Sequence, residues 1–363
     1  MRLLSLIAAI VVASACAAPG EGSPSSATHV VNAASPTPGF VATITPASPA
    51  ATAAGTTPPT PGANEAPTGR LEVTEYPVGK GQGPHDVAPA ADGGVWYTAQ
   101  RTGELGYLDP KTGATRTVRL GPGSAPHGVI VGPDGAAWVT DGGLNAIVRV
   151  DAKTNEVTRY PLPGRNANLN TATFDRDGVL WFTGQNGVVG RLDPRTGVVT
   201  VLEAPRGAGP YGIATCPDGN VYYASLAGSH VARIVRATGE SVVLTPPTSG
   251  QGSRRVWCDS KSRLWVSEWN AGKVARLDGT TWKEWKLPGA NPMAYAVYVD
   301  EDDIVWLTDF GANALVRFDP ETETFTSLPH AAANAAVRQL LGRPGEVWGA
   351  MSGQDKLLVV RTR

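Results

Sequence analysis

The chain has 363 residues, a formal net charge of −1 and only 17% charged residues, whereas apolar residues make up 42%. Because the sequence also contains no basic run, it argues against nucleic acid and anionic membrane surfaces as partners. The apolar fraction is sufficient for a large buried core, and the length allows one large domain or two average ones.

The first 16 residues resemble a secretory signal. A positive start precedes a short apolar stretch over residues 3–12, and small residues at 13–15 stand directly before Cys16. The apolar stretch is too short for a stable membrane span. Small residues before a cysteine are similar to a bacterial lipobox, so we expect Cys16 to be the lipidated first residue of the mature protein. Plain signal cleavage nearby is the alternative.

Residues 17–69 are a low-complexity segment of Ala, Pro, Thr, Ser and Gly with almost no charge. Such a composition cannot bury enough apolar surface to offset chain entropy, so we expect a disordered tether. Together with Cys16, it predicts an extracytoplasmic domain that is anchored to the bacterial membrane by lipid alone, or otherwise secreted.

The rest of the chain, residues 70–363, contains a repeat of about 42 residues. Each unit has an apolar strand, a Gly/Asp turn, an aromatic-rich strand and two further strands. The aromatic anchors are Trp96, Trp138, Trp181, Tyr222, Trp265, Trp306 and Trp348. Seven such units predict an all-β, seven-bladed β-propeller with four-stranded blades, in which the anchors pack between blades.

The two ends of the repeat region predict how the ring closes. Residues 71–76 resemble the fourth-strand segments 115–120 and 156–162, yet they precede any first strand. The last unit stops after its third strand. We therefore expect the N-terminal strand to complete the last blade, giving a closed and monomeric propeller.

Cys216 and Cys258 are the two cysteines of the repeat region. The repeat places them one residue out of register on neighbouring innermost strands, so their side chains should point to opposite faces. We expect two buried free thiols, with a disulfide as the alternative.

Two rings of equivalent positions should surround the mouth of the central channel. The first-strand ring, eleven residues before each anchor, comprises His85, His127, Asn170, Tyr211, Arg254, Tyr295 and Val337. The second-strand ring, three residues after each anchor, comprises Ala99, Asp141, Gly184, Ser225, Glu268, Asp309 and Met351. Polar residues that differ from blade to blade in otherwise apolar strands indicate a binding or catalytic site. A solvated ring without function is the alternative.

Two histidines at the same position of adjacent blades, His85 and His127, are candidates for acid–base chemistry. Asn170, Tyr211, Arg254, Glu268, Tyr295 and Asp309 are candidates for binding a small-molecule or peptide ligand. The pairs Arg254–Glu268 and Tyr295–Asp309 could instead satisfy one another within their blades.

Several motifs resemble those of the virginiamycin B lyase family. Residues 83–87 (GPHDV), 125–129 (APHGV) and 209–213 (GPYGI) are similar to its first-strand motif, and residues 177–183 and 264–269 to its second strand. The resemblance implies a lyase that linearises cyclic streptogramin B depsipeptides by elimination. A general base takes the proton α to the ester carbonyl, and a magnesium ion polarises that carbonyl. By this resemblance His127, with His85, would be the acid or base and Asp141 a metal ligand.

Two other functions remain open. A non-catalytic envelope propeller could capture a peptide, a sugar or another cell-envelope component on the same face, because Tyr211 and Tyr295 suit ligand contact. A sugar-lactone hydrolase would need several oxygen ligands converging on one metal, and Asn170, Glu268 and Asp309 lie on separate blades.

Overall fold

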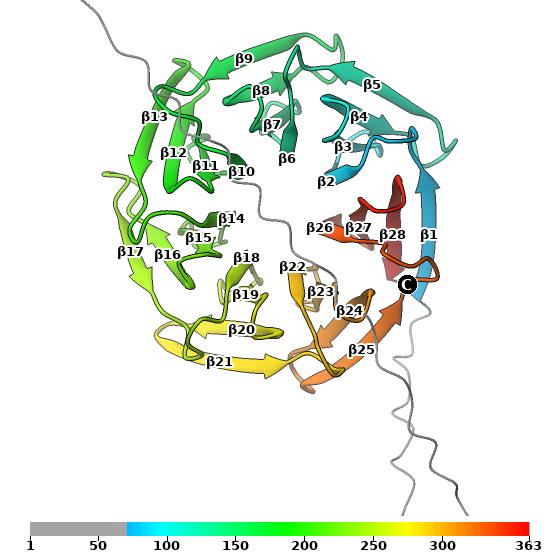
Figure 1. Cartoon of the computed structure of the whole chain (residues 1–363), viewed down its shortest axis with the longest axis vertical. Coiled ribbons are helices and arrows are strands. Elements are labelled where there is room, and N and C mark those ends of the chain that lie inside the picture. Colours follow the sequence, from blue (N-terminus) through cyan, green and yellow to red (C-terminus); the bar gives the residue numbers. More distant parts are fainter. Residues whose placement is uncertain (1–70, 363) are drawn as a thin grey trace, which may run out of the picture. The chain divides into compact units, whose positions relative to one another are not determined.

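The computed structural model describes residues 71–362, which form seven four-stranded antiparallel sheets around a central axis (Figure 1). This confirms the predicted all-β, seven-bladed propeller. Within these residues no helix is long and apolar enough to cross a membrane. The predicted signal segment, Cys16 and the tether over 17–69 lie outside the described residues.

Six blades each consist of four consecutive strands, with the first strand innermost (Figure 1). Blades one to three comprise β2 (Pro84–Pro89), β3 (Val95–Ala99), β4 (Glu104–Leu108), β5 (Thr115–Arg119), β6 (Pro126–Val131), β7 (Ala137–Asp141), β8 (Ala146–Val150), β9 (Val157–Pro161), β10 (Leu169–Phe174), β11 (Leu180–Gly184), β12 (Val188–Asp193) and β13 (Val198–Glu203). Blades four to six comprise β14 (Pro210–Thr215), β15 (Val221–Ser225), β16 (His230–Ile234), β17 (Ser241–Leu244), β18 (Ser253–Cys258), β19 (Leu264–Glu268), β20 (Lys273–Asp278), β21 (Thr281–Lys286), β22 (Ala294–Val299), β23 (Val305–Asp309), β24 (Ala314–Asp319) and β25 (Thr324–Pro329).

Blade seven joins the two ends of the repeat region, as predicted. It comprises β26 (Val337–Arg343), β27 (Glu346–Met351), β28 (Lys356–Thr362) and, outermost, β1 (Leu71–Pro77). β1 pairs antiparallel with β28, and Lys356 Nζ lies 2.8 Å from Glu75 Oε2 across this pair. Every blade therefore has four strands, and the ring has no gap.

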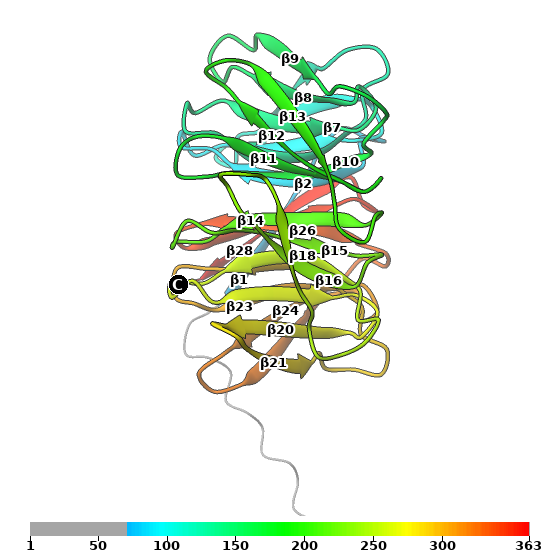
Figure 2. The same ribbon diagram turned by 90° about the vertical axis from the view of Figure 1, so that its left-hand side faces the viewer.

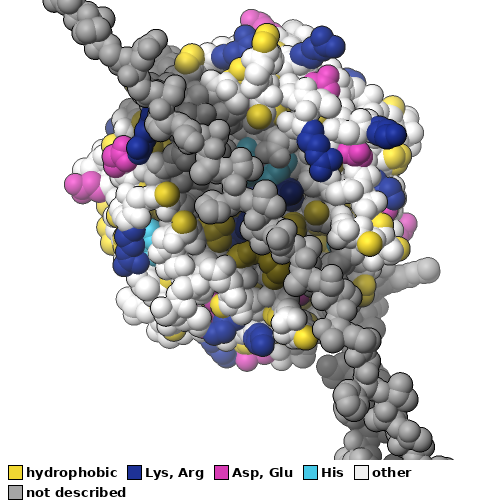
Figure 3. Space-filling view, viewed as in Figure 1, with side chains coloured by type: hydrophobic (Ala, Val, Ile, Leu, Met, Phe, Trp, Pro, Cys, Tyr) yellow, Lys and Arg dark blue, Asp and Glu magenta, His cyan; other side chains and the backbone are white. Residues whose placement is uncertain are grey.

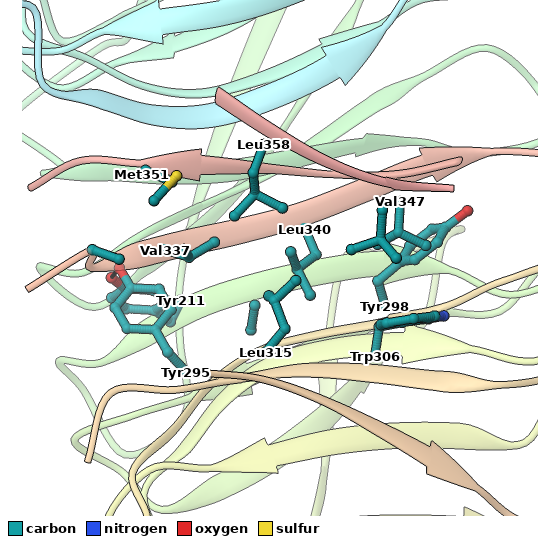
Figure 4. Close-up of a cluster of buried hydrophobic side chains, with 13 residues drawn as sticks. Tyr211, Tyr295, Tyr298, Trp306, Leu315, Val337, Leu340, Val347, Met351 and Leu358 are labelled. Carbon is teal, nitrogen blue, oxygen red and sulfur yellow. Dashed lines mark hydrogen bonds between the residues drawn. The ribbon is translucent and has the colours of Figure 1, made fainter. Parts of the chain in front are cut away.

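The aromatic anchors hold neighbouring blades together. The six anchor tryptophans are at most 2% exposed, whereas Tyr222 is half-buried. Trp306 lies in a cluster with Leu340 and Val347, which come from the next blade (Figure 4). Burying both faces of each sheet in this way is the main source of stability in a propeller. Figure 2 shows the ring from the side, with strands running between its two faces.

The cysteine prediction is wrong, because Cys216 and Cys258 form a disulfide with Cα atoms 5.3 Å apart. Cys216 lies one residue beyond the end of β14, where the alternation of side chains along a strand no longer sets its direction. Cys258 is the last residue of β18, and both side chains are buried in one cluster between blades four and five. Strand register therefore does not determine where the Cys216 side chain points.

A β-bulge near the start of every first strand shapes the channel mouth. The pairing register shifts between Pro84 and Val87 in blade one, between Ser253 and Val256 in blade five, and at the equivalent place in the other blades. A bulge re-aims side chains, so two consecutive residues can reach the centre. Hydroxyl groups stabilise five of the bulges by accepting from a bulge N–H, and in the first four of them the hydroxyl also donates to a first-strand carbonyl of the next blade. They belong to Thr98, Thr140, Thr183, Ser267 and Thr308.

Candidate functional site at the channel mouth

The first-strand ring converges on the hollow at the centre of one face. Figure 3 shows histidine and Lys or Arg side chains gathered in this hollow, beside apolar ones. Most members of the ring are joined by the contacts described below. The first-strand ring predicted from the sequence therefore forms one connected group of side chains.

His85 and His127 are in contact on adjacent blades. Their ring centroids are 3.8 Å apart, and the residues are 2% and 8% exposed. His85 Nδ1 lies 2.8 Å from Asp86 Oδ1, so Nδ1–H donates to the carboxylate and Nε2 keeps its lone pair. His127 Nε2 lies 3.2 Å from Asn170 Nδ2, which donates to it.

Both imidazoles are held in the neutral form. Burial lowers the pKa of His85 well below 6.5, and the positive charges of Arg255, Arg338 and Arg254 lower it further. Burial also lowers the pKa of His127 well below 6.5, with His85 as the next cause. A neutral imidazole can accept a proton, so the pair has the protonation state of a general base at neutral pH.

An ion pair crosses the channel below the histidines. Arg255 Nη2 lies 3.1 Å from Asp86 Oδ1, and Arg255 Nη1 donates to Thr171 Oγ1 at 2.9 Å. Burial raises the pKa of the Asp86 carboxyl, and Arg255 opposes that shift. Thr171 in turn donates to Asn170 Oδ1 at 2.7 Å. The chain of contacts therefore runs from His85 through Asp86, Arg255 and Thr171 to Asn170.

Aromatic rings surround Arg254 on the other side of the mouth. Its Cζ lies 3.6 Å from the ring centroid of Tyr295, 4.5 Å from that of Tyr211 and 4.6 Å from that of Trp269. Arg254 Nη2 donates to Tyr211 Oη at 2.8 Å, and the two tyrosine hydroxyls are 2.7 Å apart. Phe310 stacks on Tyr295 with centroids 4.7 Å apart. These rings, which we call the aromatic cage, fix a cation by stacking and cation–π attraction.

The cage also changes the tyrosine pKa values. Burial would raise the pKa of Tyr295, but Arg254, Arg255 and Arg338 outweigh burial and lower the pKa below 10. Burial raises the pKa of Tyr211, and the neighbouring Tyr295 hydroxyl raises it further. Of the two, Tyr295 is the better proton donor.

The two aspartates of the second-strand ring, Asp141 and Asp309, bind loop groups. Asp141 accepts hydrogen bonds from Ala125 N at 2.9 Å and Ser124 Oγ at 2.5 Å. Asp309 accepts from Met293 N at 2.8 Å. Both carboxylates therefore fix the loop before a first strand. The pairings Arg254–Glu268 and Tyr295–Asp309 are not among the contacts of the described residues.

Glu268 differs from these two aspartates. It is fully buried, and neither of its carboxylate oxygens has a partner among the described residues. Burial raises its pKa to about 8, with the nearby Glu284 carboxylate as the second cause. This carboxyl is protonated at neutral pH.

The donor set of the site does not suit magnesium, which prefers several carboxylate and water oxygens. Ligand atoms of His85, Asp86 and His127 lie within 4.8 Å of one another. Only one of the three is a carboxylate, and it is bound by Arg255. Asp141, the predicted magnesium ligand, accepts from loop N–H and hydroxyl groups. The magnesium expectation thus rests on the resemblance alone.

The sequence interpretation missed the second residue of each bulge. Asp86, Thr171, Arg255 and Arg338 directly follow members of the first-strand ring, and the alternation rule would have turned them away from it. The signal was present as consecutive polar residues in an apolar strand, for example Arg254–Arg255. At the same position, blades two, four and six have the small residues Gly128, Gly212 and Ala296.

Residues 64–288 match the family model described as the virginiamycin B lyase family. The chain belongs to this family. A curated virginiamycin B lyase from Nocardia farcinica is 33% identical over 165 residues, which are 44% of this chain and 55% of that protein. The match thus spans about half the length of that curated relative.

Solved structures of the family support the fold. A streptogramin B lyase structure superposes with a TM-score of 0.75 at 23% identity, covering 81% of this chain and 98% of the other. A virginiamycin B lyase from Staphylococcus aureus gives 0.76 at 21% identity, covering 81% and 100%. A catalytically inactive histidine-to-alanine variant from that organism, with quinupristin, gives the same values.

Proposed function

We propose that this protein is a carbon–oxygen lyase that opens a cyclic ester by elimination. The observation that carries the proposal is the pair of buried, neutral and mutually contacting imidazoles of His85 and His127 at the centre of the ring. A neutral imidazole, oriented by a carboxylate, is the group that proton abstraction from carbon requires. Family membership supports the same reaction class.

The proposed step balances without a co-reactant. His85 Nε2 takes a proton from the carbon next to the C–O bond, the C–H electrons form a carbon–carbon double bond, and the C–O pair leaves on the ester oxygen. The ring therefore opens to an alkene and a carboxylate with no change in mass. Asp86 accepts from His85 Nδ1–H and stabilises the imidazolium that forms. His127, held by Asn170, contacts the other side of the imidazole.

The test incubates the purified protein with a streptogramin B depsipeptide, with and without added magnesium, and identifies products by mass spectrometry. We expect a linear product of unchanged mass that is absent with His85→Ala and with His127→Ala. A requirement for magnesium would support the resemblance-based expectation. A product heavier by one water would instead indicate hydrolysis and the lactonase alternative.

A non-catalytic binding propeller is the second candidate. It is favoured by the aromatic cage, whose flat rings suit contact with a peptide or sugar. If no product forms from the depsipeptide under any condition, binding of envelope-derived ligands becomes the leading function.

We also propose an extracytoplasmic location with a lipid anchor on Cys16. The disulfide between Cys216 and Cys258 supports an oxidising compartment. Metabolic labelling with a radioactive fatty acid should modify the wild-type protein and not Cys16→Ser. Release of unlabelled wild-type protein into the medium would contradict the anchor and favour plain cleavage.

A further inference from the structure

The charges around the hollow are unbalanced. Three guanidinium groups, those of Arg254, Arg255 and Arg338, act together on His85 and on Tyr295. The carboxylate that contacts them is Asp86, which pairs with Arg255. Arg254 and Arg338 form no ion pair with any carboxylate among residues 71–362. Both side chains are half-buried, so they are also accessible.

The two unpaired arginines are held in place by neutral partners. Arg254 lies in the aromatic cage, and its Nε is buried without a partner in the described part of the chain. Arg338 Nε donates to Ser352 Oγ at 2.8 Å. Both guanidinium groups are thus held in place and partly shielded from water while their charge has no carboxylate partner within residues 71–362, which leaves them available to an anionic ligand.

We infer that Arg254 and Arg338 form a binding subsite for the carboxylate group of a ligand, next to the His85–His127 pair. Guanidinium groups match a carboxylate with two parallel hydrogen bonds, and a low-dielectric hollow strengthens that attraction. The aromatic cage offers an apolar surface for the group that carries the carboxylate. A neutral ligand would leave the two charges uncompensated.

The subsite would also stabilise the leaving group of the elimination, and this second role rests on the proposed function. Breaking the C–O bond of an ester by elimination places the electron pair on a departing carboxylate. In this proposal the positive charges of Arg254 and Arg338 would stabilise that carboxylate as it leaves. Binding of a carboxylate, in contrast, can be measured without any turnover.

The experiment uses benzoate as probe and benzamide, its neutral counterpart of nearly the same shape, as control. Isothermal titration calorimetry with the purified protein should show benzoate binding at least about tenfold more tightly than benzamide, in the presence of EDTA as well as magnesium. Arg254→Gln and Arg338→Gln should each weaken benzoate binding about tenfold, with benzamide unchanged. Arg195→Gln, on an outer loop with a side chain 74% exposed, is the matched control and should change nothing.

The outcomes separate the subsite from the lyase proposal. Equal affinities for benzoate and benzamide, or full affinity in both arginine variants, would overturn the subsite whatever the enzymatic activity. Phenyl phosphate that binds tenfold more tightly than benzoate would overturn carboxylate as the ligand class. If Arg254→Gln fails to fold, Arg254→Lys keeps the charge without the planar fork and should retain part of the benzoate affinity.

Discussion

The two sides of the channel mouth use the same strand position for opposite purposes. Blades one and two place His85 and His127 there, and burial keeps both imidazoles neutral. Blades four to six place Tyr211, Arg254 and Tyr295 there, and aromatic faces hold a permanent cation. In the functions proposed above, one scaffold position would serve proton transfer on one side and charge recognition on the other. The following predictions test this division.

Loss of either histidine should have the largest effect. His85→Asn and His127→Asn should lower kcat for ring opening by about a thousandfold, because the proton acceptor or its neighbour is missing. Benzoate affinity should stay within about twofold of the wild type. His330→Asn, after an outer strand, is the control. Equal losses of turnover and benzoate affinity would contradict separate functions for the two sides.

The Asp86–Arg255 ion pair connects the two sides, and breaking it should destabilise the fold. Asp86→Asn leaves the Arg255 guanidinium buried without its counter-ion, so we expect a loss of about 4 kcal/mol in the free energy of unfolding. Urea denaturation measures this loss. Asp193→Asn, which removes an exposed pair with Arg195, should leave the urea midpoint nearly unchanged. Similar midpoints for the two variants would refute the structural role of the buried pair.

The disulfide should stabilise the charge-binding side. It closes a loop with a sequence separation of 42, for which the loss of chain entropy in the unfolded state corresponds to about 4 kcal/mol as an upper value. Cys216→Ser with Cys258→Ser should therefore lower the melting temperature without abolishing the fold. An unchanged melting temperature with and without reductant would show that the bond does not form in solution.

Glu268 should make stability depend on pH. Its pKa in the folded state, about 8, lies above the ordinary 4.5. The free energy of unfolding therefore falls progressively as pH rises between these two values, because the carboxyl must ionise in a buried place. The free energy of unfolding of Glu268→Gln should thus exceed that of the wild type by on the order of 3 kcal/mol at pH 9 and by almost nothing at pH 4. Glu284→Gln is the matched contrast, because Glu284 pairs with Lys273 and its loss should destabilise. A gain that is equal at both pH values would contradict a titrating Glu268.

The smallest effect should be the coupling between the sides. The pKa of His85 is lowered mainly by burial and then by the arginines, Arg254 among them. Arg254→Gln should therefore move the acidic limb of the pH–activity profile to higher pH, since the His85 imidazole becomes easier to protonate. An acidic limb that stays in place would mean that the two sides act independently.

The repeat made the fold predictable, while the site was only half predictable. The regular spacing of the anchors indicated seven blades and the closure by β1, because burial between blades demands the same large side chain in each unit. The positions of His85, His127, Arg254 and Tyr295 followed from that spacing. Asp86, Arg255 and Arg338 did not, because a bulge breaks the alternation on which the sequence argument relied.

The direction of Cys216 was unpredictable for a similar reason, since it lies just past a strand end. The burial of Glu268 without a partner depends on neighbouring strands that the repeat does not specify. Local pattern predicted which strands form, and irregular backbone decided which polar groups meet.

The pairing of β1 with β28 has a consequence for synthesis at the ribosome. β1 leaves the ribosome before any other strand of the propeller, yet its partner is the last strand made. Throughout elongation, β1 and the growing series of blades each expose an unpaired strand edge, which other chains can join. A nearly complete ring therefore stays open to pairing with other chains until its final strand is made.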